Sequence, residues 1–185
     1  MKQRFIFAAT ILSVVFAACS NNTTKEENAS TATEQQVSTD SNTAAAPSEN
    51  ITAEALPAFT IQDIAGNNIN LQSLKGKKVF VNLWASWCPP CRREMPSIQK
   101  LSKAVDQNKV SFVMLSLDDN FDKAKAFVKR QKLSLPIYYP AESLPAMFNV
   151  QGIPTTFIFD ESGMLIQRID GGDNYDSQEY RKLLQ

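Results

Sequence analysis

The 185-residue sequence contains no histidine, only three cysteines and no excess of either charge, with 19 basic and 19 acidic residues. The absence of histidine excludes Ser-His and Cys-His catalysis and metal sites that use imidazole. The balanced charge gives no basic surplus and no acidic run, so we expect no nucleic-acid partner. A composition with 43% hydrophobic residues suits one globular domain with some additional sequence.

The N-terminal residues have the composition of an export signal. Lys2 and Arg4 give a positive start, and residues 5–17 are mostly apolar. This stretch is too short to span a bilayer comfortably, since a membrane helix needs about 20 apolar residues. The pattern therefore predicts a signal that directs the protein out of the cytoplasm.

The end of this segment resembles a bacterial lipobox. Two alanines precede Cys19, and Phe16 stands where such sites usually carry leucine. The resemblance implies a signal peptide over residues 1–18, cleavage before Cys19 and lipidation of its sulfur. The alternative is an ordinary secretory signal followed by an incidental cysteine. With the lipid, the protein would be anchored to a membrane of the cell envelope, its soluble domain lying in the periplasm or at the surface.

The next segment, residues 19–55, is rich in Asn, Thr, Ser, Ala, Glu and Gln and has almost no large apolar side chains. Such a composition cannot bury enough apolar surface to offset the entropy cost of ordering the chain. We therefore expect a disordered tether between the lipid and a folded domain over residues 56–185.

Within residues 56–185, apolar strands alternate with amphipathic helices. Residues 59–61 and 69–71 alternate apolar and polar side chains about a Gly-Asn-Asn turn, as a hairpin does. Further strands are expected over 79–84, 110–117, 135–139, 155–159 and 164–169, and helices from Cys88, from about 121, over 143–148 and from about Ser177. The run Asp118-Asp119-Asn120 offers N-cap residues for the second of these helices. The alternation predicts an α/β domain with a central mixed β-sheet flanked by helices.

Cys88 and Cys91 form a Cys-x-x-Cys pair at the junction of an apolar strand and a helix. A thiol at a helix N-terminus is shifted towards thiolate by the free N–H groups and the helix dipole. A second thiol three residues later lies one turn away, close enough to displace the first from a mixed disulfide. The pair predicts thiol–disulfide exchange with no cofactor beyond its own disulfide.

Two motifs resemble those of the thioredoxin superfamily. Trp-Cys-Pro-Pro-Cys over residues 87–91 is followed, some sixty residues later, by Gly-Ile-Pro-Thr-Thr over 152–156. The fuller pattern, over about 57–170, resembles the TlpA/ResA-type extracytoplasmic thiol–disulfide oxidoreductases. A lone Cys-x-x-Cys would be weak support, but two motifs in this order are specific. The resemblance implies a thioredoxin-like fold.

The resemblance also assigns roles to individual residues. Cys88 would be the nucleophile and Cys91 the buried resolving thiol. Pro154 would be a cis-proline opposite the pair, which leaves the Ile153 backbone free to pair with a substrate strand. Trp87, immediately before Cys88, would offer an apolar contact to protein substrates. Together with Trp87, the candidate substrate-binding residues are Pro89, Pro90, Ile153 and Pro154.

Exchange also needs a group that takes the proton of Cys91. Cytoplasmic thioredoxins place a buried aspartate six residues before the first cysteine, but Asn82 occupies that position here and cannot accept a proton. Glu94 is the substitute candidate, because it lies one helical turn after Cys91 and matches a glutamate of ResA-type proteins. Partial burial would raise its pKa into a useful range. The alternative is a solvated helix glutamate paired with a lysine or arginine.

The dipeptide between the cysteines indicates the direction of the reaction. Pro89 and Pro90 have no N–H to offer the Cys88 sulfur, so its thiolate receives few hydrogen bonds. We expect a Cys88 pKa above roughly 6 and a reducing couple, nearer thioredoxin at about −270 mV than DsbA at about −120 mV. The expected substrates are disulfides of envelope proteins, apocytochromes c among them, with a membrane thiol-reductant donor supplying electrons.

The sequence also bears on other functions. A disulfide oxidase or isomerase stays open without a potential. A Cu(I)-binding chaperone of thioredoxin fold is less favoured, and two cysteines without histidine are too few for a closed zinc site, so no metal is expected. A peroxiredoxin would carry threonine three residues before its reactive cysteine, where this chain has Ala85.

Overall fold

The structure is a computed structural model that describes residues 54–185. The predicted signal peptide, the lipidation of Cys19 and nearly all of the tether lie outside the described residues. Backbone pairing begins at Glu54, whose carbonyl accepts from the Leu165 N–H, and continues with the bridge from Ala55 to Met164. The folded part therefore includes the last two residues of the segment that we assigned to the tether.

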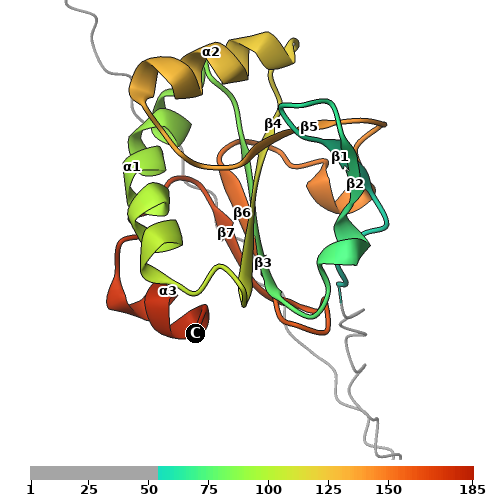
Figure 1. Cartoon of the computed structure of the whole chain (residues 1–185), viewed down its shortest axis with the longest axis vertical. Coiled ribbons are helices and arrows are strands. Elements are labelled where there is room, and N and C mark those ends of the chain that lie inside the picture. The colour runs from blue at the N-terminus through green and yellow to red at the C-terminus, as the bar shows by residue number, and fades with distance from the viewer. Residues whose placement is uncertain (1–53) are drawn as a thin grey trace, which may run out of the picture. The chain divides into compact units, whose positions relative to one another are not determined.

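A seven-stranded mixed sheet has the order β2-β1-β5-β4-β3-β6-β7 (Figure 1). The strands are β1 (Thr60–Gln62), β2 (Asn68–Asn70), β3 (Lys78–Trp84), β4 (Val110–Ser116), β5 (Ile137–Pro140), β6 (Thr155–Phe159) and β7 (Leu165–Asp170). β3, β4 and β5 are parallel, whereas β6 runs antiparallel to β3. The carboxyl ends of the parallel strands thus meet at one edge, where β3 leads into the Cys-x-x-Cys segment.

Three α-helices and two short 3-10 helices complete the domain: α1 (Pro89–Ala104), α2 (Phe121–Gln131), α3 (Gln178–Leu183), η1 (Leu71–Leu74) and η2 (Ala146–Phe148). A side chain caps the N-terminus of each α-helix. Cys88 accepts from the Cys91 N–H, Asn120 from the Asp122 N–H, and Ser177 from the Tyr180 N–H. These caps satisfy N–H groups that lack an intrahelical acceptor, so each helix begins at a defined residue.

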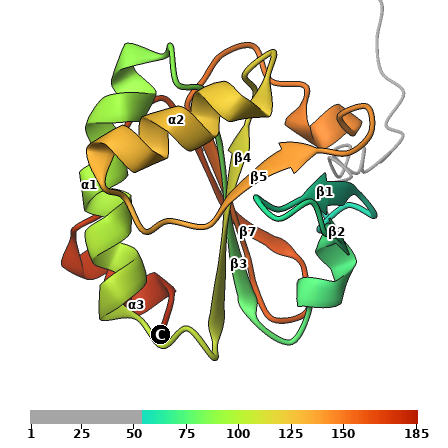
Figure 2. The same ribbon diagram turned by 45° about the horizontal axis from the view of Figure 1, so that its top comes forward.

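The sheet separates two apolar clusters. α1, α2 and α3 cover one face, on which Phe80 and Trp84 of β3 are fully buried (Figure 2). The N-terminal hairpin and the 3-10 helices supply much of the other cluster, which contains Val79, Val81 and Leu83. Successive β3 side chains alternate between these clusters, because strand side chains point to opposite faces. Asn82 therefore projects towards α1, although it is polar.

The prediction of an α/β domain with a central mixed sheet flanked by helices is confirmed, with differences at several boundaries. The expected helix over 143–148 is only the 3-10 turn η2, because Pro145 has no N–H and serves as its N-cap. β5 begins at Ile137 rather than Leu135, since the preceding Pro136 cannot donate to the ladder. α1 continues through Pro96 to Ala104.

Candidate active site

The two cysteines are joined by a disulfide at the start of α1. Cys88 Sγ and Cys91 Sγ are 2.03 Å apart, and the Cα atoms are separated by 5.3 Å. Cys88 is the N-cap residue and is 3% exposed, whereas Cys91 lies in the first turn and is fully buried. Cys88, the residue predicted as the nucleophile, is thus the slightly more exposed of the two.

The surroundings of the Cys88 sulfur contain few hydrogen-bond donors. Its Sγ accepts a hydrogen bond from the Cys91 N–H at 3.3 Å, while the Ile153 carbonyl oxygen lies 3.6 Å away on the other side. Pro89 and Pro90 follow Cys88 and have no N–H. Among residues 54–185, the Cys91 amide is the one donor found on this sulfur. A thiolate here would gain a single backbone hydrogen bond and face a carbonyl dipole that opposes it.

The segment opposite the disulfide contains a cis peptide bond between Ile153 and Pro154. The Thr155 hydroxyl donates to the Gly152 carbonyl at 2.8 Å, and the Gly171 N–H donates to the Pro154 carbonyl at 2.8 Å. A pocket of about 370 Å³ runs along this segment and includes Arg168 in its lining. The Ile153 carbonyl oxygen, 3.6 Å from Cys88 Sγ, places this segment beside the disulfide.

The two tryptophans near the site have opposite environments. Trp84, at the end of β3, is fully buried and packs its ring 5.6 Å from that of Phe127, centroid to centroid. Trp87 is 63% exposed, which is unusual for so large an apolar side chain. It leaves an apolar surface immediately before Cys88, the predicted nucleophile.

Glu94 is buried, at 3% exposed, between α1, β3 and the segment after β7. Its Oε1 accepts a hydrogen bond from Asn82 Nδ2 at 2.8 Å, and its Oε2 accepts one from the Asp173 N–H at 3.2 Å. Burial raises the pKa of Glu94 to about 7, and these two hydrogen bonds act in the opposite direction. Glu94 is therefore not the solvated helix glutamate of the alternative interpretation.

A pocket of about 390 Å³ opens beside Glu94, between the first turns of α1 and the segment 172–174. Pro90 and Arg93 line it on the helix side, and Asp173 lines it on the other. The carboxyl group therefore adjoins a space that water can enter. A proton held on Glu94 has a route to solvent that does not cross the apolar core.

Sequence reasoning missed the polar chain that continues from Glu94 into the core. Asn82 Nδ2 also donates to Thr156 Oγ1 at 2.9 Å, and that hydroxyl shares a 2.7 Å hydrogen bond with the Tyr175 hydroxyl. Burial raises the pKa of Tyr175 above its usual range, so the phenol stays protonated. Thr156 belongs to the second recognised motif, but no signal in the sequence joined it to Glu94.

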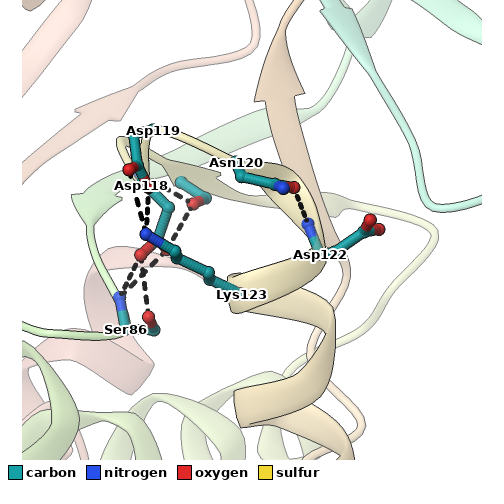
Figure 3. A network of polar contacts seen from close by, with 7 residues as sticks. Ser86, Asp118, Asp119, Asn120, Asp122 and Lys123 are labelled. Carbon is teal, nitrogen blue, oxygen red and sulfur yellow. Dashed lines mark hydrogen bonds and ion pairs between the residues drawn. The ribbon is translucent and has the colours of Figure 1, made fainter.

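Sequence reasoning also misjudged Asp118, which it grouped with Asp119 and Asn120 as N-cap residues. Asn120 alone caps α2, while the Asp118 carboxylate turns towards the segment between β3 and α1 (Figure 3). It accepts hydrogen bonds from the Ser86 N–H and hydroxyl. The position of Asp118 in the sequence could have indicated this contact. Asp118 follows β4, Ser86 follows β3, and the carboxyl ends of these adjacent parallel strands lie at the same edge of the sheet.

Within residues 54–185, no group of three or more Cys, Asp or Glu residues is arranged to hold a metal ion. No helix in this range is long and apolar enough to cross a bilayer.

The fold, the disulfide at the start of α1 and the facing cis-proline are those of a thioredoxin-like thiol–disulfide oxidoreductase. The chain belongs to the Redoxin family, which it matches over residues 52–184. It is 39% identical to the thioredoxin-like protein YneN of Bacillus subtilis over 111 residues, which are 59% of this chain and 65% of YneN. It is 34% identical to the thiol-disulfide oxidoreductase ResA of Bacillus thuringiensis over 128 residues, which are 68% of this chain and 74% of ResA.

Solved structures show the same likeness. StoA of Bacillus subtilis superimposes with a TM-score of 0.57 at 28% identity, covering 68% of this chain and 98% of StoA. A DsbE-type thiol:disulfide interchange protein of Chlorobium tepidum superimposes with a TM-score of 0.62 at 25% identity, covering 71% and 94% of the two chains. The thioredoxin-like fold implied by the sequence motifs is thereby confirmed.

Proposed function

We propose that this protein is a membrane-tethered thiol–disulfide oxidoreductase that reduces disulfides of other envelope proteins. The observation that supports the reducing direction is the poor stabilisation of a Cys88 thiolate. Its sulfur meets one backbone N–H and one carbonyl oxygen, at 3.3 and 3.6 Å. A weakly stabilised thiolate destabilises the reduced form of the pair, which makes the couple a better reductant.

The reaction begins with the reduced pair. The Cys88 thiolate attacks one sulfur of the substrate disulfide, and the other substrate sulfur leaves as a thiolate. Cys91 then loses its proton and attacks Cys88 Sγ, which closes the Cys88–Cys91 disulfide and releases the second substrate sulfur. Two electrons pass to the substrate, and both of its sulfurs end as thiols after protonation.

Glu94 is the proposed acceptor of the Cys91 proton. It lies three residues after Cys91 on α1, is buried with it, and has a pKa of about 7. A base of that pKa can take up and release a proton near neutral pH, where general acid–base transfer is most efficient. The adjoining pocket lets the proton reach solvent between turnovers.

The proposed surroundings follow from the N-terminal sequence and the relatives. Lipidation of Cys19 would tether the domain to an envelope membrane, and a membrane thiol-reductant donor would reduce the Cys88–Cys91 disulfide after each cycle. Disulfide-containing envelope proteins would be the substrates, with apocytochromes c a specific candidate. Trp87, Pro89, Pro90 and the Ile153–Pro154 segment would form the surface that receives them. The two sulfurs would be the only redox group that the reaction needs.

The first test is the reduction potential of the Cys88–Cys91 couple, equilibrated against glutathione and dithiothreitol buffers. We expect a value below about −230 mV, more reducing than an envelope oxidase. A value near about −150 mV would reject the reductant and favour an oxidase or isomerase.

A second test captures the substrates. The Cys91→Ser variant cannot resolve the mixed disulfide, so it should accumulate covalent complexes through Cys88 in envelope extracts. The Cys88→Ser variant is the matched control and should accumulate none. Labelling with a radioactive fatty acid, compared with a Cys19→Ser variant, separately tests the lipid anchor.

A further inference from the structure

Asp118 forms a hydrogen-bonded connection between the end of β4 and the segment that precedes Cys88. The carboxylate is 3% exposed and accepts from the Ser86 N–H at 3.0 Å, the Ser86 hydroxyl at 2.7 Å and the Ser116 hydroxyl at 2.8 Å. Ser86 stands two residues before the nucleophile, in the short link from β3 to α1. Figure 3 shows the Asp118 side chain directed at this link and away from α2.

All three of these donors are electrically neutral, so none of them cancels the charge of Asp118. The cation Lys123 interacts with Asp118 only through space and donates its hydrogen bonds to Asp119, at 2.7 and 2.9 Å to the two carboxylate oxygens (Figure 3). Burying a carboxylate without a directly paired cation is costly. Neutral side chains could hold the link by hydrogen bonds alone, so the charge itself calls for an explanation.

We propose that Asp118 is a positioning residue that fixes Ser86 before Cys88 and whose negative charge disfavours the Cys88 thiolate. The hydrogen bonds to Ser86 hold the link, and hence the N-cap geometry of Cys88. The buried carboxylate is hydrogen-bonded to Ser86, two residues from Cys88 in the chain, and at such short range in a poorly hydrated interior a like charge raises the pKa of a thiol. A higher Cys88 pKa makes the disulfide couple more reducing.

This inference rests on the proposed exchange chemistry of Cys88, but its test measures a thiol pKa and so does not depend on the direction of that chemistry. The test is the Asp118→Asn substitution in the Cys91→Ser background, in which Cys88 is the one thiol of the folded domain. Thiolate absorbance is followed against pH, and the rate of Cys88 alkylation provides a second reading. The matched control is Asp119→Asn, which neutralises the exposed carboxylate next in the chain.

We expect Asp118→Asn to lower the Cys88 pKa by about 0.5–1 unit, since one like charge is removed. With both cysteines present, the same substitution should shift the equilibrium constant with glutathione towards the reduced pair by up to about tenfold, or about 30 mV for two electrons. Asp119→Asn should leave both values unchanged. An unchanged Cys88 pKa in a folded Asp118→Asn protein overturns the proposal, and so does an equal shift in Asp119→Asn.

If Asp118→Asn does not fold, the proposal can be tested by NMR on a protein that keeps Asp118. In the reduced Cys91→Ser protein, the carboxyl carbon resonance of Asp118 should shift as Cys88 titrates, because the two charges interact. The resonance of Asp119 should respond less. An Asp118 resonance that does not register the Cys88 titration contradicts the proposal, even if the potential proves to be that of a reductant.

Discussion

Asn82 Nδ2 donates a 2.8 Å hydrogen bond to Glu94 Oε1 across the layer between β3 and α1. Cytoplasmic thioredoxins carry a buried aspartate at the position of Asn82. In this chain the position instead holds a neutral side chain that donates to Glu94, the acid on α1. Asn82 Oδ1 is buried and has no partner among the described residues, so the side chain is oriented by its amide nitrogen. The hydrogen bonds that the two Glu94 oxygens accept from Asn82 and from the Asp173 N–H favour the ionised carboxyl and so oppose the effect of burial on its pKa.

Cys91 should resolve a mixed disulfide at a rate that rises with pH near pH 7, as Glu94 loses its proton. Replacing Glu94 by glutamine should abolish this rise and lower the rate. Glutamine keeps the shape of the side chain but cannot take up a proton, and loss of a general base costs about a hundredfold or more. Single-turnover exchange with a small disulfide, measured from pH 5 to about 9, checks this.

The matched control is Glu161→Gln, which changes an exposed glutamate in the turn between β6 and β7. Its pH profile should coincide with that of the unsubstituted protein. An unchanged Cys91 pKa together with an unchanged profile in Glu94→Gln would remove Glu94 from the mechanism.

The raised pKa of Glu94 should make the oxidised domain less stable as the pH rises. Its pKa increases from 4.5 to about 7 on folding, so between these values the folded state keeps a proton that the unfolded chain releases. The free energy of unfolding therefore falls across this window, by about 3 kcal/mol at roughly 1.4 kcal/mol per unit, and the loss is complete above pH 7.

Urea denaturation of the protein and of Glu94→Gln, at intervals from pH 4 to 8, checks this prediction. The difference in free energy of unfolding between the two should shift in favour of the glutamine variant as the pH rises, since that variant has no proton to lose. A difference that stays constant across the window would show that Glu94 titrates at its ordinary pKa in the folded protein.

Asn82→Ala should raise the Glu94 pKa above 7, because the Asn82 hydrogen bond lowers it and burial would then act with less opposition. The carboxyl carbon resonance of Glu94, followed against pH, measures the shift. Thr156→Val is the control, since it removes a hydroxyl from the same chain of hydrogen bonds but leaves the Asn82–Glu94 contact in place. A lower pKa in Asn82→Ala would mean that water replaces the amide as a better donor.

Local signals made the central elements predictable from sequence. The apolar run of β3, the N-cap position of Cys88 and the apolar face of α1 all depend on residues near one another in the chain. Cys88 and Ile153 lie side by side although they are 65 residues apart in the chain. This proximity was predicted from the recognised motifs and not from any periodicity. The fold class was therefore predictable from the sequence alone.

The environment of Glu94 was not accessible in the same way. The sequence put this residue one turn after Cys91, but its burial depends on the segment after β7, whose Asp173 N–H lies 79 residues away in the chain. The role of Asp118 was predicted wrongly for a different reason. Aspartate suits both a helix N-cap and a buried acceptor, and only the position of Ser86 in space decides between them.

Trp84 and Trp87 should separate stability from substrate binding. Trp84→Ala should lower the free energy of unfolding by about 3–5 kcal/mol, because it empties a fully buried site. Trp84→Phe should cost less, since Trp84 Nε1 has no hydrogen-bond partner among residues 54–185 and only part of the packing is lost. Trp87→Ala should change stability by less than about 0.5 kcal/mol, because that side chain is mostly exposed.

The same Trp87→Ala variant should weaken the reduction of a protein disulfide, through a higher KM, and leave the reduction of a small disulfide unchanged. The exposed indole offers apolar area that only a protein substrate is large enough to cover. Urea denaturation, insulin reduction and reduction of a small aromatic disulfide, run on the three variants, distinguish the two roles. Equal losses on both substrates would place Trp87 in the chemistry at Cys88 and not in substrate binding.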